Sequence, residues 1–133
     1  MSQIYTKVIE IKHCDSLHIV KFSFEDITLS MMSLELKKNV QVGSEVLLQV
    51  KPSHVAIGKN ISGELSYSNQ IKSKIVSIEN GQLLSSIKLE IAHHIIIESI
   101  ITLNSSLRIN LQVGDEVIAF IKASELSIAK VLS

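Results

Sequence analysis

The chain has 133 residues, with 13 Lys and Arg against 13 Asp and Glu, and 46% of its residues are hydrophobic. A chain of this length and apolar content can bury a core without disulfides or metals, which excludes an intrinsically disordered protein. The charges also balance locally, seven of each sign in residues 1–64 and six of each in 65–133, so neither half is a basic arm for nucleic acid.

No uncharged apolar stretch is long enough for a membrane helix, and no basic segment followed by an apolar one opens the chain. The single cysteine, Cys14, cannot form an internal disulfide and is interpreted as an inert small residue. We therefore expect a cytoplasmic protein without membrane contact.

Apolar and polar residues alternate with a period of two over 20–24, 45–50 and 87–91, which is typical of half-buried strands. Asn80-Gly81 predicts a hairpin, and a positive φ is expected at Gly43 and Gly114, each before a strand. Helical turns are expected only near 33–38 and 103–110. Short strands separated by turn signals predict an all-β chain of small barrels.

The chain also repeats itself. Residues 40–46 (VQVGSEV) match residues 111–117 (LQVGDEV), and each copy continues to a K-x-S turn, Lys51 to Ser53 or Lys122 to Ser124. These segments are offset by 71 residues, whereas residues 7–11 match 74–78 at an offset of 67, so the second copy carries a four-residue insertion. The Gly- and Asn-containing residues 59–64 predict a linker, with one module over 1–58 and the other over 65–133.

Catalytic motifs such as a nucleophile elbow, a P-loop or a zinc-protease helix are absent from the sequence, so no enzyme is predicted. His13, Cys14 and His18 form a weak metal-site candidate that we interpret as structural or exposed. His93 and His94 are interpreted as a strand-entry turn.

Hydrogen-bond donors are what the second copy does offer: Ser66 to Gln70, Thr102 to Ser105, Arg108, and Lys122 to Ser124. A deprotonated tetrahedral oxyanion only accepts hydrogen bonds, so hydroxyls, turn N–H groups and one ammonium suit it. Each of these residues alone is equally typical of a turn, a helix cap or a solvated strand end, and spacing does not separate the two interpretations.

These residues resemble the Mop/TOBE family, the molybdate- and tungstate-binding modules of molbindins, molybdate-responsive regulators and molybdate-transporter ATPases. The resemblance covers nearly the whole chain as two copies. The family's S-A-R-N-Q corresponds to residues 66–70 (SYSNQ), its I-T-x-x-S to 101–105 (ITLNS), and its G-x-x-V and K-A-S to 114–117 (GDEV) and 122–124 (KAS).

The resemblance implies two tandem five-stranded OB-like barrels, each with a short helical turn. It also implies a non-catalytic protein that stores or buffers molybdate or tungstate at subunit interfaces, without an organic cofactor. The implied oxyanion-binding residues are Ser66, Ser68, Asn69, Thr102, Ser105, Lys122, the backbone N–H of Ala123, and Ser124. Lys51, Ser53 and Arg108 are weaker candidates, and no bare metal cation is implied.

Two departures from the family pattern bear on this site. Ser68 replaces the family's arginine, which removes a forked, charged donor. The first copy lacks S-x-R-N at its start, and Met31 is expected in the place of Thr102, so only its K-x-S turn remains.

We expect a homo-oligomer, a trimer of two-module chains or else a dimer. The alternative function is the ligand-sensing domain of a regulator or transporter ATPase; a module that begins at Met1 favours a stand-alone protein. An OB-type single-strand nucleic-acid binder is disfavoured because aromatic residues make up 4% of the chain and the net charge is zero.

Overall fold

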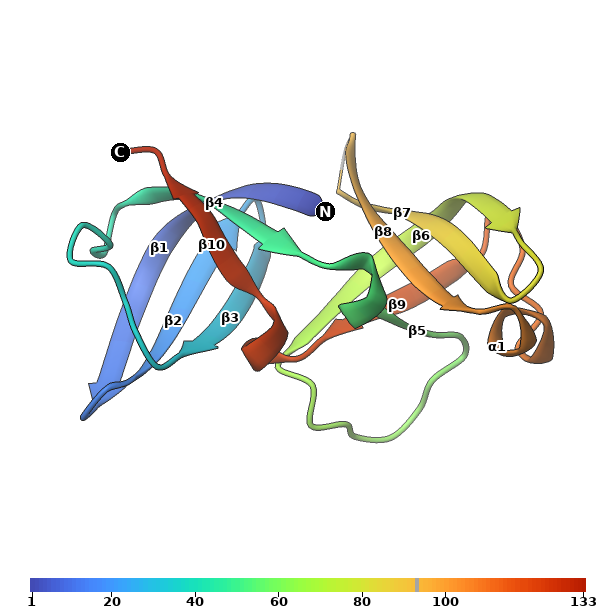
Figure 1. Cartoon of the computed structure of the whole chain (residues 1–133), viewed down its shortest axis with the longest axis horizontal. Coiled ribbons are helices and arrows are strands. Elements are labelled where there is room, and N and C mark those ends of the chain that lie inside the picture. Colours follow the sequence, from blue (N-terminus) through green and yellow to red (C-terminus); the bar gives the residue numbers. More distant parts are fainter. Residues whose placement is uncertain (93) are drawn as a thin grey trace.

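The computed structural model describes residues 1–92 and 94–133, and among these residues ten strands form two five-stranded antiparallel sheets (Figure 1). The first module is the sheet with the order β10-β4-β1-β2-β3, and the second module is the sheet β5-β9-β6-β7-β8. The first contains β1 (Ser2–Cys14), β2 (Leu17–Phe24), β3 (Ile27–Ser33), β4 (Glu45–Val50) and β10 (Ser127–Val131). The second contains β5 (Ala56–Gly58), β6 (Asn69–Asn80), β7 (Leu84–Ala92), β8 (Ile95–Thr102) and β9 (Glu116–Ile121).

The apolar residues of the predicted alternating pattern form the core. Val20 and Phe22 of β2 are fully buried, as are Ile87 and Leu89 at the equivalent positions of β7. Each sheet curls around its apolar face, and buried aliphatic residues of both sheets join in one cluster (Figure 1). The prediction of an all-β chain of two five-stranded modules is confirmed.

The modules exchange their last strands. β5 belongs to the first repeat but pairs with β9, with Ile57 opposite Ala119, and β10 belongs to the second repeat but pairs with β4, with Ile128 opposite Leu48. Residues 59–64 do connect the two repeats, between β5 and β6. The sheets nevertheless do not coincide with the predicted ranges 1–58 and 65–133, because each is closed by a strand of the other repeat.

The repeated Q-V-G-x-E-V segment is a turn that recurs in both modules. Gly43 and Gly114 both have φ of 95°, which confirms the expected positive φ, and only glycine adopts this conformation without strain. The N–H of Gly43 donates to the Val8 carbonyl and that of Gly114 to the Ile75 carbonyl, each at 2.8 Å. Each turn is therefore bonded to the bulge of the first strand of its module.

The four-residue insertion divides between two places. One residue is a bulge in β7, between Glu90 and Ala92, and the other three lie in the segment that contains α1 (Leu103–Arg108), before the turn at Gly114. The helical turn expected over 103–110 is confirmed, but the one expected over 33–38 is wrong. Between equivalent positions of the third strand and that turn the first module has three residues fewer than the second, and this segment is irregular.

Asn80-Gly81 begins the β6–β7 connection, as predicted. In the expected turn before β8, His94 has φ of 64°, and His93 lies outside the described residues. Two further helical turns, η1 (Pro52–His54) and η2 (Ala123–Glu125), follow β4 and β9. Each module thus has a short helical turn, as expected.

Candidate functional site

The two K-x-S turns have the same geometry. Lys51 and Lys122 stand one residue beyond β4 and β9 in extended conformation, with φ and ψ of −72° and 139° and of −66° and 146°. The carbonyl of each lysine accepts from the N–H three residues on, His54 at 2.9 Å and Glu125 at 3.0 Å, which starts the helical turn. Both lysine side chains are exposed, and across 1–92 and 94–133 neither ammonium has a hydrogen-bond or ion-pair partner. Each turn therefore presents a free positive charge.

The opening segment of the second repeat lies beside its lysine. Asn69 is paired with Ile121 at the end of the β6–β9 ladder, so Ser68 and Lys122 each stand one residue beyond this pair. Ser66 and Ser68 are exposed there, as is Ser124. One end of the second sheet thus gathers most of the predicted donors: Ser66, Ser68, Lys122, the Ala123 backbone and Ser124.

Asn69 is placed differently from these exposed donors. Its side chain is 1% exposed. The side-chain amide is hydrogen-bonded at both ends to the backbone of Ser30 in β3: Oδ1 accepts from the Ser30 N–H at 2.7 Å, and Nδ2 donates to the Ser30 carbonyl at 2.9 Å. In this chain Asn69 therefore joins the start of β6 to the first module.

A matching contact occurs at the pseudo-equivalent place. Ser2 stands where Asn69 stands in the repeat, and its Oγ accepts from the Glu98 N–H in β8 at 2.8 Å. Ser30 and Glu98 are themselves equivalent in the third strands. Each repeat thus begins by bonding the third strand of the other module, once through an amide and once through a hydroxyl.

The two lysine turns meet between the modules. The His54 Nδ1 of η1 lies 2.8 Å from the Glu125 Oε2 of η2. A cavity of about 220 Å³ next to this pair is lined from the first repeat by Lys51 and Gln49, and from the second by Ser124 and Ser127. An ammonium and hydroxyls from two repeats therefore face one small cavity.

His54 and Glu125 were not among the predicted site residues. Each is the third residue after the lysine of its K-x-S turn, at the same position of the repeat. A basic and an acidic side chain at equivalent positions is the signal from which this contact could have been found.

Thr102, Ser105 and Arg108 form a separate group at α1. The Thr102 Oγ1 caps the helix by accepting from the Ser105 N–H at 3.1 Å and donates to the Ser105 Oγ at 2.9 Å. The Arg108 Nη2 donates to the same Oγ at 3.3 Å. Figure 1 shows α1 at the outer end of the second module, whereas η2 packs on β3. Within one chain the structure does not bring this group to Lys122.

The prediction that Met31 takes the place of Thr102 in the first module is wrong. Val20 pairs with Met31 in the first module, and the equivalent Ile87 pairs with Ser99 in the second. Met31 therefore corresponds to Ser99. Thr102 corresponds to Leu34, which has no hydroxyl to cap a helix.

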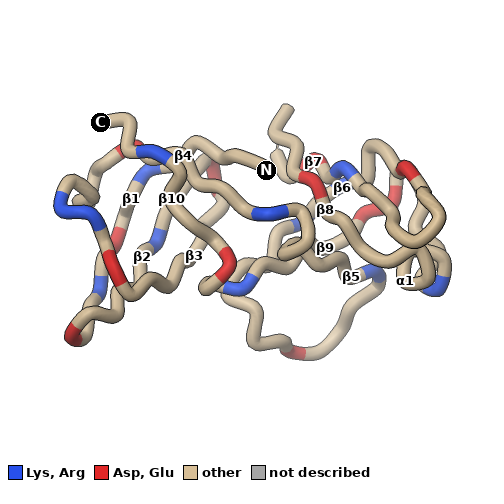
Figure 2. Tube along the Cα trace, viewed as in Figure 1, with Lys and Arg blue, Asp and Glu red and all other residues tan. Residues whose placement is uncertain are grey.

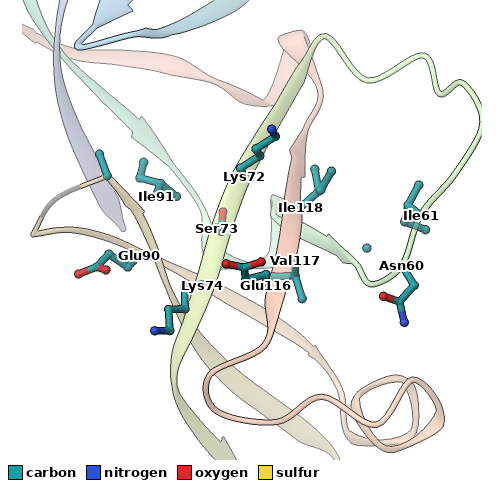
Figure 3. Close-up of a pocket in the computed structure, with 12 residues that line it drawn as sticks. Asn60, Ile61, Lys72, Ser73, Lys74, Glu90, Ile91, Glu116, Val117 and Ile118 are labelled. Carbon is teal, nitrogen blue, oxygen red and sulfur yellow. The ribbon is translucent and has the colours of Figure 1, made fainter.

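A second cavity, of about 650 Å³, lies on the second module near the end of β5 (Figure 3). Its charged lining is of both signs: Lys72 and Lys74 of β6, Glu90 of β7 and Glu116 of β9. Lys74 stands opposite Glu90 on one side and Glu116 on the other. Because these charges compensate one another and none of the predicted donors lies here, this cavity is not the candidate anion site.

Charges of both signs are interspersed along both modules (Figure 2), without a basic stripe among the described residues. The described residues include no helix that is long and apolar enough to span a membrane.

Comparisons with known proteins agree with this architecture. The TOBE domain model matches residues 65–128. The probable molybdenum-pterin-binding protein of Haemophilus influenzae is 35% identical over 65 residues, which make up 49% of this chain and 94% of that protein. The solved structure of the cytoplasmic molybdate-binding protein ModG, with molybdate bound, superposes with a TM-score of 0.91. That match has 23% identity and covers 96% of this chain and 94% of ModG, so both modules share its fold.

The sequence match spans almost the whole length of a relative above 30% identity, and the domain match covers the repeat that holds the fuller donor set. The chain therefore belongs to the Mop/TOBE family.

Proposed function

We propose that this chain binds molybdate or tungstate without catalysis and serves to store or buffer the anion in the cytoplasm. The observation that carries the proposal is the free ammonium of Lys122 at the same end of the second sheet from which the exposed Ser66, Ser68 and Ser124 continue. The printed descriptions of its relatives, a molybdenum-pterin-binding protein and a cytoplasmic molybdate-binding protein, support the same ligand class.

The chemistry of this donor set fits a dianion. Molybdate at neutral pH offers acceptor oxygens alone, so a site needs donors on several sides and some positive charge. Lys122 supplies the charge, and serine hydroxyls with the Ala123 N–H supply direction. A hydrogen bond to a charged group contributes about 1.5–3 kcal/mol, so loss of the family's arginine at Ser68 weakens this site without removing its other donors.

The donor set is completed only between chains. Thr102, Ser105 and Arg108 lie at the outer end of the second module, away from Lys122 of the same chain. Exposed apolar side chains adjoin the K-x-S region: Met32 is 41% and Leu34 69% exposed, and both line a cavity shared with Ser124. We infer a homo-oligomer, a trimer in preference to a dimer, in which one chain's α1 meets another's lysine turn.

Isothermal titration with molybdate, tungstate and sulfate tests the ligand. We expect saturable binding of the first two, and sulfate separates a molybdate site from a general dianion site. An absence of heat with molybdate and tungstate at tens of micromolar protein, or equal binding of all three anions, would overturn the proposal.

Sedimentation velocity tests the assembly. We expect three chains per particle for the wild type and smaller particles for Leu34→Glu, which places a charge in the apolar contact. A wild-type monomer that still binds molybdate with full affinity would contradict a site shared between chains.

A further inference from the structure

Two histidines face each other at the end of the β1–β2 hairpin. His13 is directly opposite His18 in the ladder, and their ring centroids are 5.9 Å apart with the planes tilted by 34°. Directly opposed residues of antiparallel strands project from the same face with Cβ atoms about 5 Å apart. Two imidazoles therefore share one face of this hairpin, and that end of β1 and β2 lies at the outer end of the first module (Figure 1).

The hydrogen bond of His18 fixes which of its nitrogens carries the proton. The Nδ1 lies 2.8 Å from the Ser16 carbonyl oxygen, which can only accept, so Nδ1 is the donor. The neutral ring then has its lone pair on Nε2. Histidines that bind metals are typically held in this way, with the second nitrogen donating to a carbonyl or carboxylate. His18 is thus oriented as a ligand in advance.

His13 leaves ring nitrogens available too. Its side chain is exposed, and within the described residues its one contact is the ring of His18. Its neighbours on β1, Lys12 and Cys14, project from the opposite face of the strand by alternation. On the shared face the third polar side chain is Ser33 of β3, which is paired with His18, and its hydroxyl donates to the Glu35 carbonyl at 2.5 Å.

The second module has a different pair of residues at the same two positions. Asn80 and Ser85 stand at the positions of His13 and His18 and are paired in the ladder. There the Ser85 Oγ donates to the Asn80 Oδ1 at 2.7 Å, and Ser85 is fully buried. That pair is closed by its own hydrogen bond, whereas the histidine pair is open to solvent.

We propose that the tip of the β1–β2 hairpin is a two-histidine site for a divalent first-row transition-metal ion. The Nε2 of His18 and one ring nitrogen of His13 are the ligands. No group of three or more His, Cys, Asp or Glu side chains is assembled for a metal within the described residues, so water completes the coordination. Imidazole nitrogens bind Cu²⁺ most strongly in the first-row series, so the order Cu²⁺ above Ni²⁺ and Zn²⁺ is expected.

The experiment is a titration of the full chain with CuCl₂, in the Cys14→Ser background so that copper does not oxidise the thiol. We expect one Cu²⁺ per chain and an electron paramagnetic resonance spectrum with nitrogen coupling from imidazole. His13→Gln and His18→Gln each lose affinity by at least the roughly 10- to 100-fold that loss of an outer-shell partner already costs. His94→Gln, which also removes one histidine, keeps the wild-type affinity.

The proposal is overturned if His13→Gln and His18→Gln bind copper as the parent does, or if His94→Gln removes binding. It is also overturned if NiCl₂ binds wild-type chain but not Cys14→Ser, since the thiol would then be a ligand. Molybdate titration of His13→Gln keeps this result separate from the anion site, because that affinity is expected to stay unchanged.

Discussion

The two modules share one plan of strands but differ in what stands at the strand ends. Beside Lys122 the second module has Ser66 and Ser68, and it also carries α1, capped by Thr102. Beside Lys51 the first module has only the chain start, with Ser2 opposite Val50 in the ladder. Identical sheets with different ends teach that the strands set position while the terminal segments set chemistry. We therefore expect the two modules to differ in how they bind an anion.

The largest expected effect is on molybdate affinity, and it differs between substitutions of the two turn lysines. Lys122→Ala removes the charge from the fuller donor set and is expected to weaken molybdate binding about 10- to 100-fold, which corresponds to 1.5–3 kcal/mol. Lys51→Ala is expected to have a smaller effect, because the hydroxyls of its cavity, Ser124 and Ser127, come from the second repeat and the first repeat lacks the S-x-R-N segment. Isothermal titration of both variants with molybdate gives the ratio of their dissociation constants directly.

Lys72→Ala is the matched control, since Lys72 is also an exposed lysine but lies at the cavity of mixed charge. The molybdate affinity of Lys72→Ala should match that of the wild type. Equal losses of molybdate affinity in Lys51→Ala and Lys122→Ala would show that the two modules contribute alike and would contradict the expected difference between them.

The next effect concerns the exchanged strands. At Gly58 in β5 an added Cβ would lie 2.5 Å from the Phe120 ring and 2.5 Å from the Ile61 side chain. Gly58→Ala therefore overpacks this strand and is expected to lower the free energy of unfolding by about 1–3 kcal/mol. Thermal unfolding should show a fall in Tm of several degrees.

In the sequence repeat Gly58 corresponds to Ala129, the residue at the bulge of β10, which already carries a Cβ. Ala129→Gly removes a methyl group from the partner strand without a clash, and its effect should be smaller. If Gly58→Ala is as stable as the wild type, β5 is not held against Phe120 as described.

The exchange of strands could not be predicted from the sequence, although both strands could. Residues 55–57 and 126–128 are short apolar segments with the same pattern, and β4 and β9 offer equivalent edges to them. Nothing local distinguishes pairing within a repeat from pairing across repeats. The repeat, the alternation and the two turn glycines were predictable because each follows from near neighbours in the chain.

The candidate site was predictable to a different degree. The donors that flank β6 and β9 were predicted from the family resemblance, which places their meeting at subunit interfaces, and not from the pairing of these two strands. The engagement of Asn69 by Ser30, and the contact of His54 with Glu125, depend on how the modules pack. Packing between two sheets carries no periodic signal, so the contact of Asn69 with Ser30 lay beyond the reach of sequence patterns. For His54 and Glu125 the one available signal was the opposite charge at equivalent positions of the repeat.

A smaller effect is expected at the contacts that join each repeat's start to the other module. Asn69→Ala leaves the partly buried N–H and carbonyl of Ser30 without their side-chain partner and is expected to cost about 1–2 kcal/mol of stability. Ser2→Ala removes a single acceptor from the Glu98 N–H and should cost less. Urea unfolding of the two variants compares them, and an Asn69→Ala no less stable than Ser2→Ala would contradict the described contact.

The smallest expected effect on stability concerns the ion pair beside β5, one of the two exchanged strands. The Lys59 Nζ after β5 lies 2.9 Å from the Asp115 Oδ2 in the turn of the second module. The Lys59 hydrogen bond, with the N–H of Gln112, lowers the pKa of the Asp115 carboxyl below its usual 3.8. The equivalent residues of the first module are Lys130 and Ser44, which has no carboxylate to pair.

A carboxyl with a lowered pKa in the folded state adds stability above its unfolded pKa and loses it as pH falls through the folded value. Asp115→Asn should therefore lower Tm slightly near pH 7, and the difference from the wild type should vanish in the acid range below pH 4 or so. Ser44→Ala removes the equivalent acceptor of the Gln41 N–H without removing a charge, so its effect should not depend on pH. A constant Asp115→Asn difference from neutral to acid pH would show that hydrogen bonding alone, rather than the charge on Lys59, fastens β5 to this turn.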